Sequence, residues 1–245
     1  MINRRYLKRF ETHQDYDFYM MQVGIVPNVS FCDDKSELHF NPTKAKIVCT
    51  FNVSDITSPT QIMNSVAIDG DYFSEVEIDG VLQPSVSDTY SFGTNGKHVV
   101  KYTLNDRETL GESAFEGCDD IAIVKIPNSV IVINGFAFTG CTNLEKIIIP
   151  SSVSEIKKSV FGGCRSLKDI TLPSISKIGS FVFEGCSSLE SITCLSKWSP
   201  VIQSNTFQDV KTGGTLYVPR GSDYSVWMGN GNYYLGLYNW TKIEQ

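Results

Sequence analysis

The chain has 245 residues, with 21 Lys and Arg against 27 Asp and Glu, which gives a net charge of −6 at pH 7. This mildly acidic balance, with no basic run, argues against nucleic-acid binding, which depends on clustered Lys and Arg. No apolar stretch approaches the roughly 18 residues that a membrane-spanning helix needs. The basic start, residues 1–10, lacks the apolar segment of a signal peptide.

Residues 1–43 are mixed and polar, and we expect a partly ordered N-terminal extension. A short helix is predicted from Tyr6 to about Met21, and two short strands at residues 29–31 and 37–40. Asn41 and Pro42 then mark a boundary.

Residues 44–104 read as short strands separated by turn signals such as Asp79-Gly80, which predicts a small immunoglobulin-like β-sandwich. This segment is expected to close one end of the apolar core that follows it. An acidic cluster within it departs from the spacing of a calcium-binding EF-hand loop, so a solvated loop is favoured over a calcium site. The expected strands are 45–53, 65–68, 74–78, 81–83, 89–92 and 98–104, and the acidic cluster is Asp69, Asp71, Glu75, Glu77 and Asp79.

Residues 105–245 contain an internal repeat. The phrase Ala-Phe-x-Gly-Cys, or a close variant, occurs four times, and its cysteines are 23, 23 and 22 residues apart. A period of this length with fixed apolar positions predicts a leucine-rich-repeat solenoid with parallel strands, of about five rungs. The four phrases are residues 114–118, 137–141, 160–164 and 182–186.

Each repeat also contains a short alternating strand, and these strands place side chains in columns. Three columns are expected to face the core: Val124, Ile147, Ile170, Ile192 and Leu216; Ile126, Ile149, Leu172, Cys194 and Val218; and Phe115, Phe138, Phe161, Phe183 and Phe207. The exposed strand face between them is the candidate ligand surface, although ordinary surface pairing is the favoured interpretation of its charges. Its central column is Lys125, Ile148, Thr171, Thr193 and Tyr217, and its flanking charges are Glu145, Lys168 and Glu190.

Four of the seven cysteines occupy one repeat position, so we expect reduced core side chains and not disulfides or metal ligands. All three tryptophans, Trp198, Trp227 and Trp240, lie near the C-terminal end. We expect residues 219–245 to form a cap over the open end of the core, with a final strand at 242–244; a sugar-binding aromatic platform is the alternative.

No nucleophile motif, phosphate-binding loop, dinucleotide fingerprint or zinc spacing occurs. We therefore expect no catalytic, cofactor-binding or metal-binding residues, and no enzyme activity.

The units "AFEGCDDIAIVKIPNSVIVI" and "AFTGCTNLEKIIIPSSVSEI" resemble the BspA-type leucine-rich repeats of bacterial surface proteins, and the tail "LYVPRGSDYSVW" is similar to that family's closing unit. The segment "IDGVLQPSV…YSFGTNGKHVVKYTL" resembles immunoglobulin-like segments that precede such repeats. The resemblance implies a cell-surface or secreted module that binds host proteins, other bacteria or polymers.

The leading hypothesis is a non-enzymatic protein-binding or adhesion module whose ligand, a surface protein or a glycan, binds the strand face. A structural assembly protein, phage- or prophage-borne, is one alternative. A carbohydrate-binding module that uses the C-terminal aromatic side chains is the other.

Overall fold

The computed structural model describes residues 44–106, 108–228 and 237–245. Ala45–Gln245 form one compact unit. The helix and strands expected in residues 1–43 lie outside the described residues. None of the helices in the described part of the chain has the length and apolar content of a bilayer-spanning segment.

The regular elements are short, as expected of a chain that turns every few residues. The strands are β1 (Lys46–Val53), β2 (Thr60–Gln61), β3 (Phe73–Ile78), β4 (Val81–Leu82), β5 (Thr89–Tyr90), β6 (Gly96–Leu104), β7 (Thr109–Leu110), β8 (Ile121–Lys125), β9 (Val132–Ile133), β10 (Lys146–Ile148), β11 (Glu155–Ile156), β12 (Asp169–Leu172), β13 (Lys177–Ile178), β14 (Ser191–Cys194), β15 (Val201–Ile202), β16 (Thr215–Val218) and β17 (Thr241–Glu244). The helices are α2 (Ser65–Asp69) and the 3₁₀ turn η2 (Ser225–Trp227).

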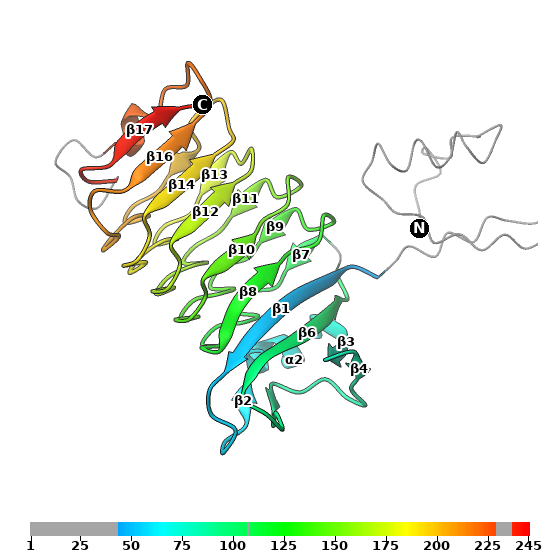
Figure 1. Cartoon of the computed structure of the whole chain (residues 1–245). Coiled ribbons are helices and arrows are strands. Elements are labelled where there is room, and N and C mark those ends of the chain that lie inside the picture. Colours follow the sequence, from blue (N-terminus) through cyan, green and yellow to red (C-terminus); the bar gives the residue numbers. More distant parts are fainter. Residues whose placement is uncertain (1–43, 107, 229–236) are drawn as a thin grey trace, which may run out of the picture. The chain divides into compact units, whose positions relative to one another are not determined.

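The repeats form a parallel β-solenoid, which confirms the predicted architecture of this part of the chain (Figure 1). One side is a continuous ladder of β7, β9, β11, β13 and β15, and the other carries β8, β10, β12, β14, β16 and β17. We number the rungs by the phenylalanine they contain, from Phe115 in rung 1 to Phe207 in rung 5. Val124 pairs with Ile147, and Ile170 with Ile192, so the inward columns stand in the predicted register.

The second side of the solenoid is interrupted between rungs 2 and 3. β8 and β10 pair in parallel and end one sheet, whereas β12, β14, β16 and β17 form another. β10 and β12 lie side by side but do not belong to a common sheet. The rungs are joined here through the opposite ladder, where β9, β11 and β13 remain paired, and through backbone hydrogen bonds along the repeat phrase.

The segment before the repeats caps the solenoid. β1 pairs antiparallel with β6 and, on its other edge, antiparallel with β8 of rung 1, giving the sheet order β10-β8-β1-β6-β3-β4. The predicted immunoglobulin-like sandwich is not confirmed, because β1, β3, β4 and β6 extend the solenoid's own sheet. In the described segment, only the two-stranded β2–β5 ribbon stands outside that sheet.

The strand expected at residues 65–68 was wrong: this segment is the helix α2. The physical reason is a capping residue just before it. The Asn64 side chain accepts a hydrogen bond from the Val66 N–H at 3.0 Å, and Gly70 ends the helix. Asn64 also holds the helix on rung 1, because its backbone N–H donates to the carbonyl of Ala114 at 3.0 Å.

A column of stacked phenylalanines runs through the core. Successive ring centroids lie 5.4, 6.0, 5.7 and 5.6 Å apart from Phe115 to Phe207, and all five rings are buried. Both ends are covered: Tyr102 packs on Phe115 at 5.0 Å, and Trp227 packs on Phe207 at 5.3 Å. The column is therefore sealed by residues from outside the four repeat phrases.

The backbone conformation at this position explains why the repeat phrase contains a glycine. Gly140 and Gly163 have φ of +74°, in the left-handed region where a side chain is strained. A Cβ on either would lie 3.7 Å from the glycine of the preceding rung, so backbone conformation, not space, selects glycine.

Candidate functional site

The strand face consists of the outward side chains on β8, β10, β12, β14 and β16. Lys125 and Thr171 are exposed, Ile148 is 44% exposed, and Thr193 and Tyr217 are partly exposed. These are the central residues of the predicted ligand surface. The structure joins Ile148 to Lys125 on one sheet, and Thr171 to Thr193 to Tyr217 on the next.

The strand face extends one residue further than predicted. Tyr217 pairs with Ile243 of β17, whose side chain is 41% exposed. This strand is predicted from the sequence, but Ile243 is not among the residues predicted for the face. The position of Ile243 between the charged residues Lys242 and Glu244 was the sequence feature that could have identified it.

The flanking charges Glu145, Lys168 and Glu190 are exposed, but they do not form the alternating ion-pair row that their signs suggest. Glu190 pairs with Lys211, Oε1 to Nζ at 2.7 Å. The hydrogen bond and charge of Lys211 lower the pKa of the Glu190 carboxyl, with a smaller contribution from Lys168. Lys211 was missed because it lies in the connection before β16, outside the repeat pattern.

A depression of about 510 Å³ opens beside this row. It lies at the interrupted junction of rungs 2 and 3, since Glu145 and Lys146 line one side and Lys168 and Asp169 the other. Ile123, Ser166 and Ser188 complete its lining. Sequence reasoning identified two of the four charges and missed Lys146 and Asp169, their immediate neighbours.

The cysteines of the repeat phrase hold the rungs together. The thiols of Cys141, Cys164 and Cys186 donate to the carbonyl oxygens of Phe115, Phe138 and Phe161 at 3.1, 3.2 and 3.1 Å. Six of the seven cysteines fall in the described residues, and all six are free and buried, as expected.

Burial keeps these thiols protonated. It raises the pKa of the Cys164 thiol well above its usual value, and it raises that of Cys186 to about 12. Thiols in this state are poor nucleophiles and metal ligands.

The C-terminal aromatic residues divide into two groups. Trp227 is fully buried and donates its Nε1–H to the Pro200 carbonyl at 3.0 Å, and Trp240 is nearly buried and donates to the Lys211 carbonyl at 2.7 Å. Both therefore belong to the cap. Trp198 is 80% exposed and is the tryptophan available to a ligand.

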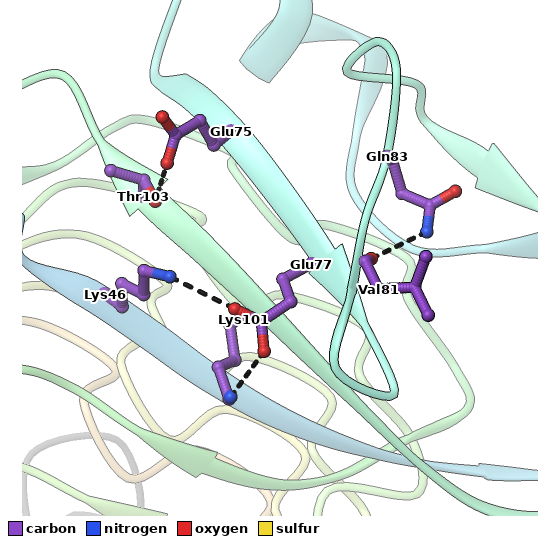
Figure 2. A network of polar contacts seen from close by, with 7 residues as sticks. All are labelled: Lys46, Glu75, Glu77, Val81, Gln83, Lys101 and Thr103. Atoms are coloured by element: carbon purple, nitrogen blue, oxygen red, sulfur yellow. Dashed lines mark hydrogen bonds and ion pairs between the residues drawn. The ribbon is translucent and has the colours of Figure 1, made fainter.

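Three carboxylates of the acidic cluster, those of Glu75, Glu77 and Asp79, are held by protein groups, and Figure 2 shows the first two. Glu77 on β3 bonds to Lys101 on β6 at 2.5 Å and to Lys46 on β1 at 3.2 Å, so one carboxylate ties three strands together. Those two hydrogen bonds lower the pKa of Glu77. The Glu75 carboxylate accepts the Thr103 hydroxyl at 3.3 Å.

Asp79 of the same cluster faces His98 at 2.7 Å. Across the described ranges, no group of three or more His, Cys, Asp or Glu side chains is arranged to hold a metal ion.

The repeat geometry can now be compared with known proteins. Residues 101–220 match the family model of the BspA type leucine rich repeat region, in six copies. This stretch consists of BspA-type repeats. The BspA-type match begins within β6 and ends just after β16, so it includes every strand of the five rungs. It counts one copy more than the five rungs predicted.

Solved structures with similar folds are also leucine-rich-repeat proteins. One from T. pallidum aligns over 55% of this chain and 66% of that chain, with 28% identity and a TM-score of 0.43. A leucine rich cell surface protein from Faecalibacterium prausnitzii aligns over 54% and 39%, with 29% identity and a TM-score of 0.37. One from Bacteroides ovatus aligns over 66% of each chain, with 18% identity and a TM-score of 0.29.

No TM-score in this set reaches 0.5, so the BspA-type repeat match carries the assignment. The chain spans less than two thirds of the length of the first two proteins. No curated protein sequence gives a match.

Proposed function

We propose that the chain is a non-enzymatic protein-binding or adhesion module of a bacterial cell-surface or secreted protein, and that its ligand binds the strand face. The observation that carries the proposal is the exposed column from Lys125 to Tyr217 on hydrogen-bonded rungs. Solenoids present extended surfaces of this kind to partners. The match to BspA-type repeats supports surface location, because the repeat units resemble those of bacterial surface proteins.

The absence of enzyme activity is part of the proposal. It is supported by the missing catalytic motifs and by the hydrogen bonds that occupy three repeat thiols and the His98 ring. The repeat thiols bond to backbone carbonyls, and both ring nitrogens of His98 have partners, the Asp79 carboxylate at 2.7 Å and the Thr94 carbonyl at 2.8 Å.

The test is a double substitution in the middle of the strand face. Thr171→Arg with Thr193→Arg adds bulk and charge on two paired rungs without touching the core. The matched control is Ser154→Arg with Ser176→Arg, two exposed serines on neighbouring rungs of the opposite ladder side.

The purified protein is screened by biolayer interferometry against immobilised host-matrix proteins, bacterial surface proteins and glycans. We expect at least one ligand whose binding the strand-face variant loses and the control variant keeps. If no panel member binds, or if both variants bind equally, the proposal is wrong.

A carbohydrate-binding module is the second candidate, favoured by Trp198. Its loop is held in place because Trp227 donates to the Pro200 carbonyl and Tyr224 donates to the Ser196 carbonyl at 2.7 Å. A fixed, exposed indole suits the flat face of a sugar. Quenching or a shift of tryptophan fluorescence on oligosaccharide addition, lost in Trp198→Ala, is the expected result. An unchanged spectrum across a glycan series would exclude this candidate.

An assembly protein, phage- or prophage-borne, is the third candidate, and β17 favours it. β17 is the last strand of its sheet and carries the exposed Ile243. Edge strands offer unpaired backbone groups to a second copy. Light scattering is expected to show concentration-dependent association that Ile243→Lys removes. A strict monomer at high concentration would rule out self-assembly.

A further inference from the structure

Strand pairing joins rungs 2 and 3 on one side of the solenoid only, although backbone hydrogen bonds also connect them along the repeat phrase, such as Phe138 N–H to the Val160 carbonyl at 3.0 Å. β9, β11 and β13 pair in register, whereas β10 and β12 end separate sheets although they lie side by side. The ring separation between Phe138 and Phe161, 6.0 Å, is the widest in the phenylalanine column. The facing edges of β10 and β12 share no strand ladder.

Four charged side chains surround this break, and we call them the charged square. Rung 2 supplies Glu145 and Lys146, and rung 3 supplies Lys168 and Asp169 at the equivalent repeat positions. The signs therefore alternate both along each rung and across the break. All four are exposed and line the depression of about 510 Å³.

The charged square is not a set of internal ion pairs. The ion pairs of the described residues involve other side chains, and Lys168 contributes only a weaker effect on Glu190. On rung 1, the equivalent positions are Ala122 and Ile123, which are uncharged. On rung 4, Glu190 is already taken by Lys211. At these two repeat positions, the charged side chains without an ion-pair partner are therefore those of rungs 2 and 3, beside the break between β10 and β12.

We propose that the charged square is a binding site for an extended peptide segment with alternating acidic and basic side chains. Such a segment offers an opposite charge to each of the four side chains at once. A polymer of one sign meets as many like charges as opposite ones, and a neutral chain leaves all four unpaired, so complementarity favours the mixed-charge peptide. This inference rests on the proposed function, since it names the ligand chemistry of the same face.

The probe is a short blocked peptide in which Glu and Lys alternate between threonines, Thr-Glu-Thr-Lys-Thr-Glu-Thr-Lys-Thr. In three comparison peptides, the four charged residues are replaced by Gln throughout, by Glu throughout, or by Lys throughout. Binding to the full chain is followed by ¹⁵N–¹H NMR titration. We expect shifts confined to the neighbourhood of residues 145–169, with the alternating peptide binding about tenfold more tightly than the others. Equal binding by the Gln peptide, or no shift there at millimolar concentration, would overturn the proposal.

A charge swap at constant net charge tests the site itself. Glu145→Lys with Lys168→Glu leaves two positive side chains on rung 2 and two negative ones on rung 3, which removes the alternation along each rung. The matched control is Glu155→Lys with Lys177→Glu, a register pair on the opposite ladder. The charged-square swap is expected to weaken the alternating peptide about tenfold, and the control swap to leave it unchanged.

Equal effects of the two swaps would mean that the site is not the charged square. The outcome is separable from that of the proposed function. A surface ligand that is lost in the Thr171→Arg and Thr193→Arg variant, but kept by the charged-square swap, would leave the strand-face proposal standing and refute this one.

Discussion

Removing one ring from the phenylalanine column tests whether the column holds the solenoid together. Phe161 is fully buried in rung 3, between Phe138 at 6.0 Å and Phe183 at 5.7 Å. Phe→Ala in a core costs about 3–5 kcal/mol, including about 0.5–1.5 kcal/mol for each lost ring contact. The ladder of β11 and β13 prevents the neighbouring rungs from closing the cavity, so we expect Phe161→Ala to cost about 4 kcal/mol. This is a large part of the roughly 5–15 kcal/mol of a typical domain.

The assay is urea-induced unfolding followed by far-ultraviolet circular dichroism. Phe161→Leu, which keeps most of the apolar volume, is expected to cost about 1–2 kcal/mol and serves if the alanine variant does not fold. The matched control is Phe136→Ala in the preceding rung, because Phe136 is only half-buried. Its loss should cost about 1 kcal/mol. Similar costs for Phe161→Ala and Phe136→Ala would refute the column as the main source of stability.

Three further predictions follow from buried groups. Both ring nitrogens of His98 lie within hydrogen-bond distance of acceptors, the Asp79 carboxylate and the Thr94 carbonyl. Burial alone would lower the pKa of His98, but these hydrogen bonds and the Asp79 charge outweigh burial and raise the pKa. The charged ring therefore stabilises the fold fully below the unfolded pKa of about 6.5, and this stabilisation is lost as pH rises through the folded pKa. In Asp79→Asn, the urea midpoint of unfolding should depend less on pH between about pH 5 and 8. A midpoint with the same pH dependence as in the unsubstituted protein would contradict this. In the folded protein, a thiol reagent should modify at most one cysteine, Cys32, which lies outside the described residues. The six buried cysteines should react only after denaturant unfolds the chain. Rapid modification of more than one thiol without denaturant would contradict the structure. Trp227→Ala should cost about 3–5 kcal/mol of unfolding free energy and Trp198→Ala less than about 0.5 kcal/mol, and equal costs would refute the division between cap and exposed tryptophan.

The repeat made the solenoid predictable from sequence alone. Val124 and Ile147 are buried in register because each follows its repeat cysteine by the same six residues. The pairing of β1 with β8 was not predictable in this way. It joins strands about seventy positions apart in opposite directions, and no local pattern records that choice.

The candidate ligand surface was only partly predictable for the same reason. Alternation along a strand identifies outward residues such as Thr171, whatever the neighbouring rung does. The interruption between β10 and β12 depends on how two rungs of equal length pack on each other, which the repeat pattern does not encode. Lys146 and Asp169 are therefore recognised as site residues only in the structure. The helix α2 was missed because the cap at Asn64 outweighed the strand preference of Val66 and Ile68.

The antiparallel strand β1 on rung 1 has a consequence for how such chains change in length. Each interior rung offers its neighbours nearly the same ring spacing and the same backbone direction, so a duplicated rung can enter the middle of the stack. At the N-terminal end the next position is occupied by a strand of opposite direction. The fold therefore accommodates an added or removed rung only between β1 and the tryptophan cap, where the contacts that cover both ends are kept.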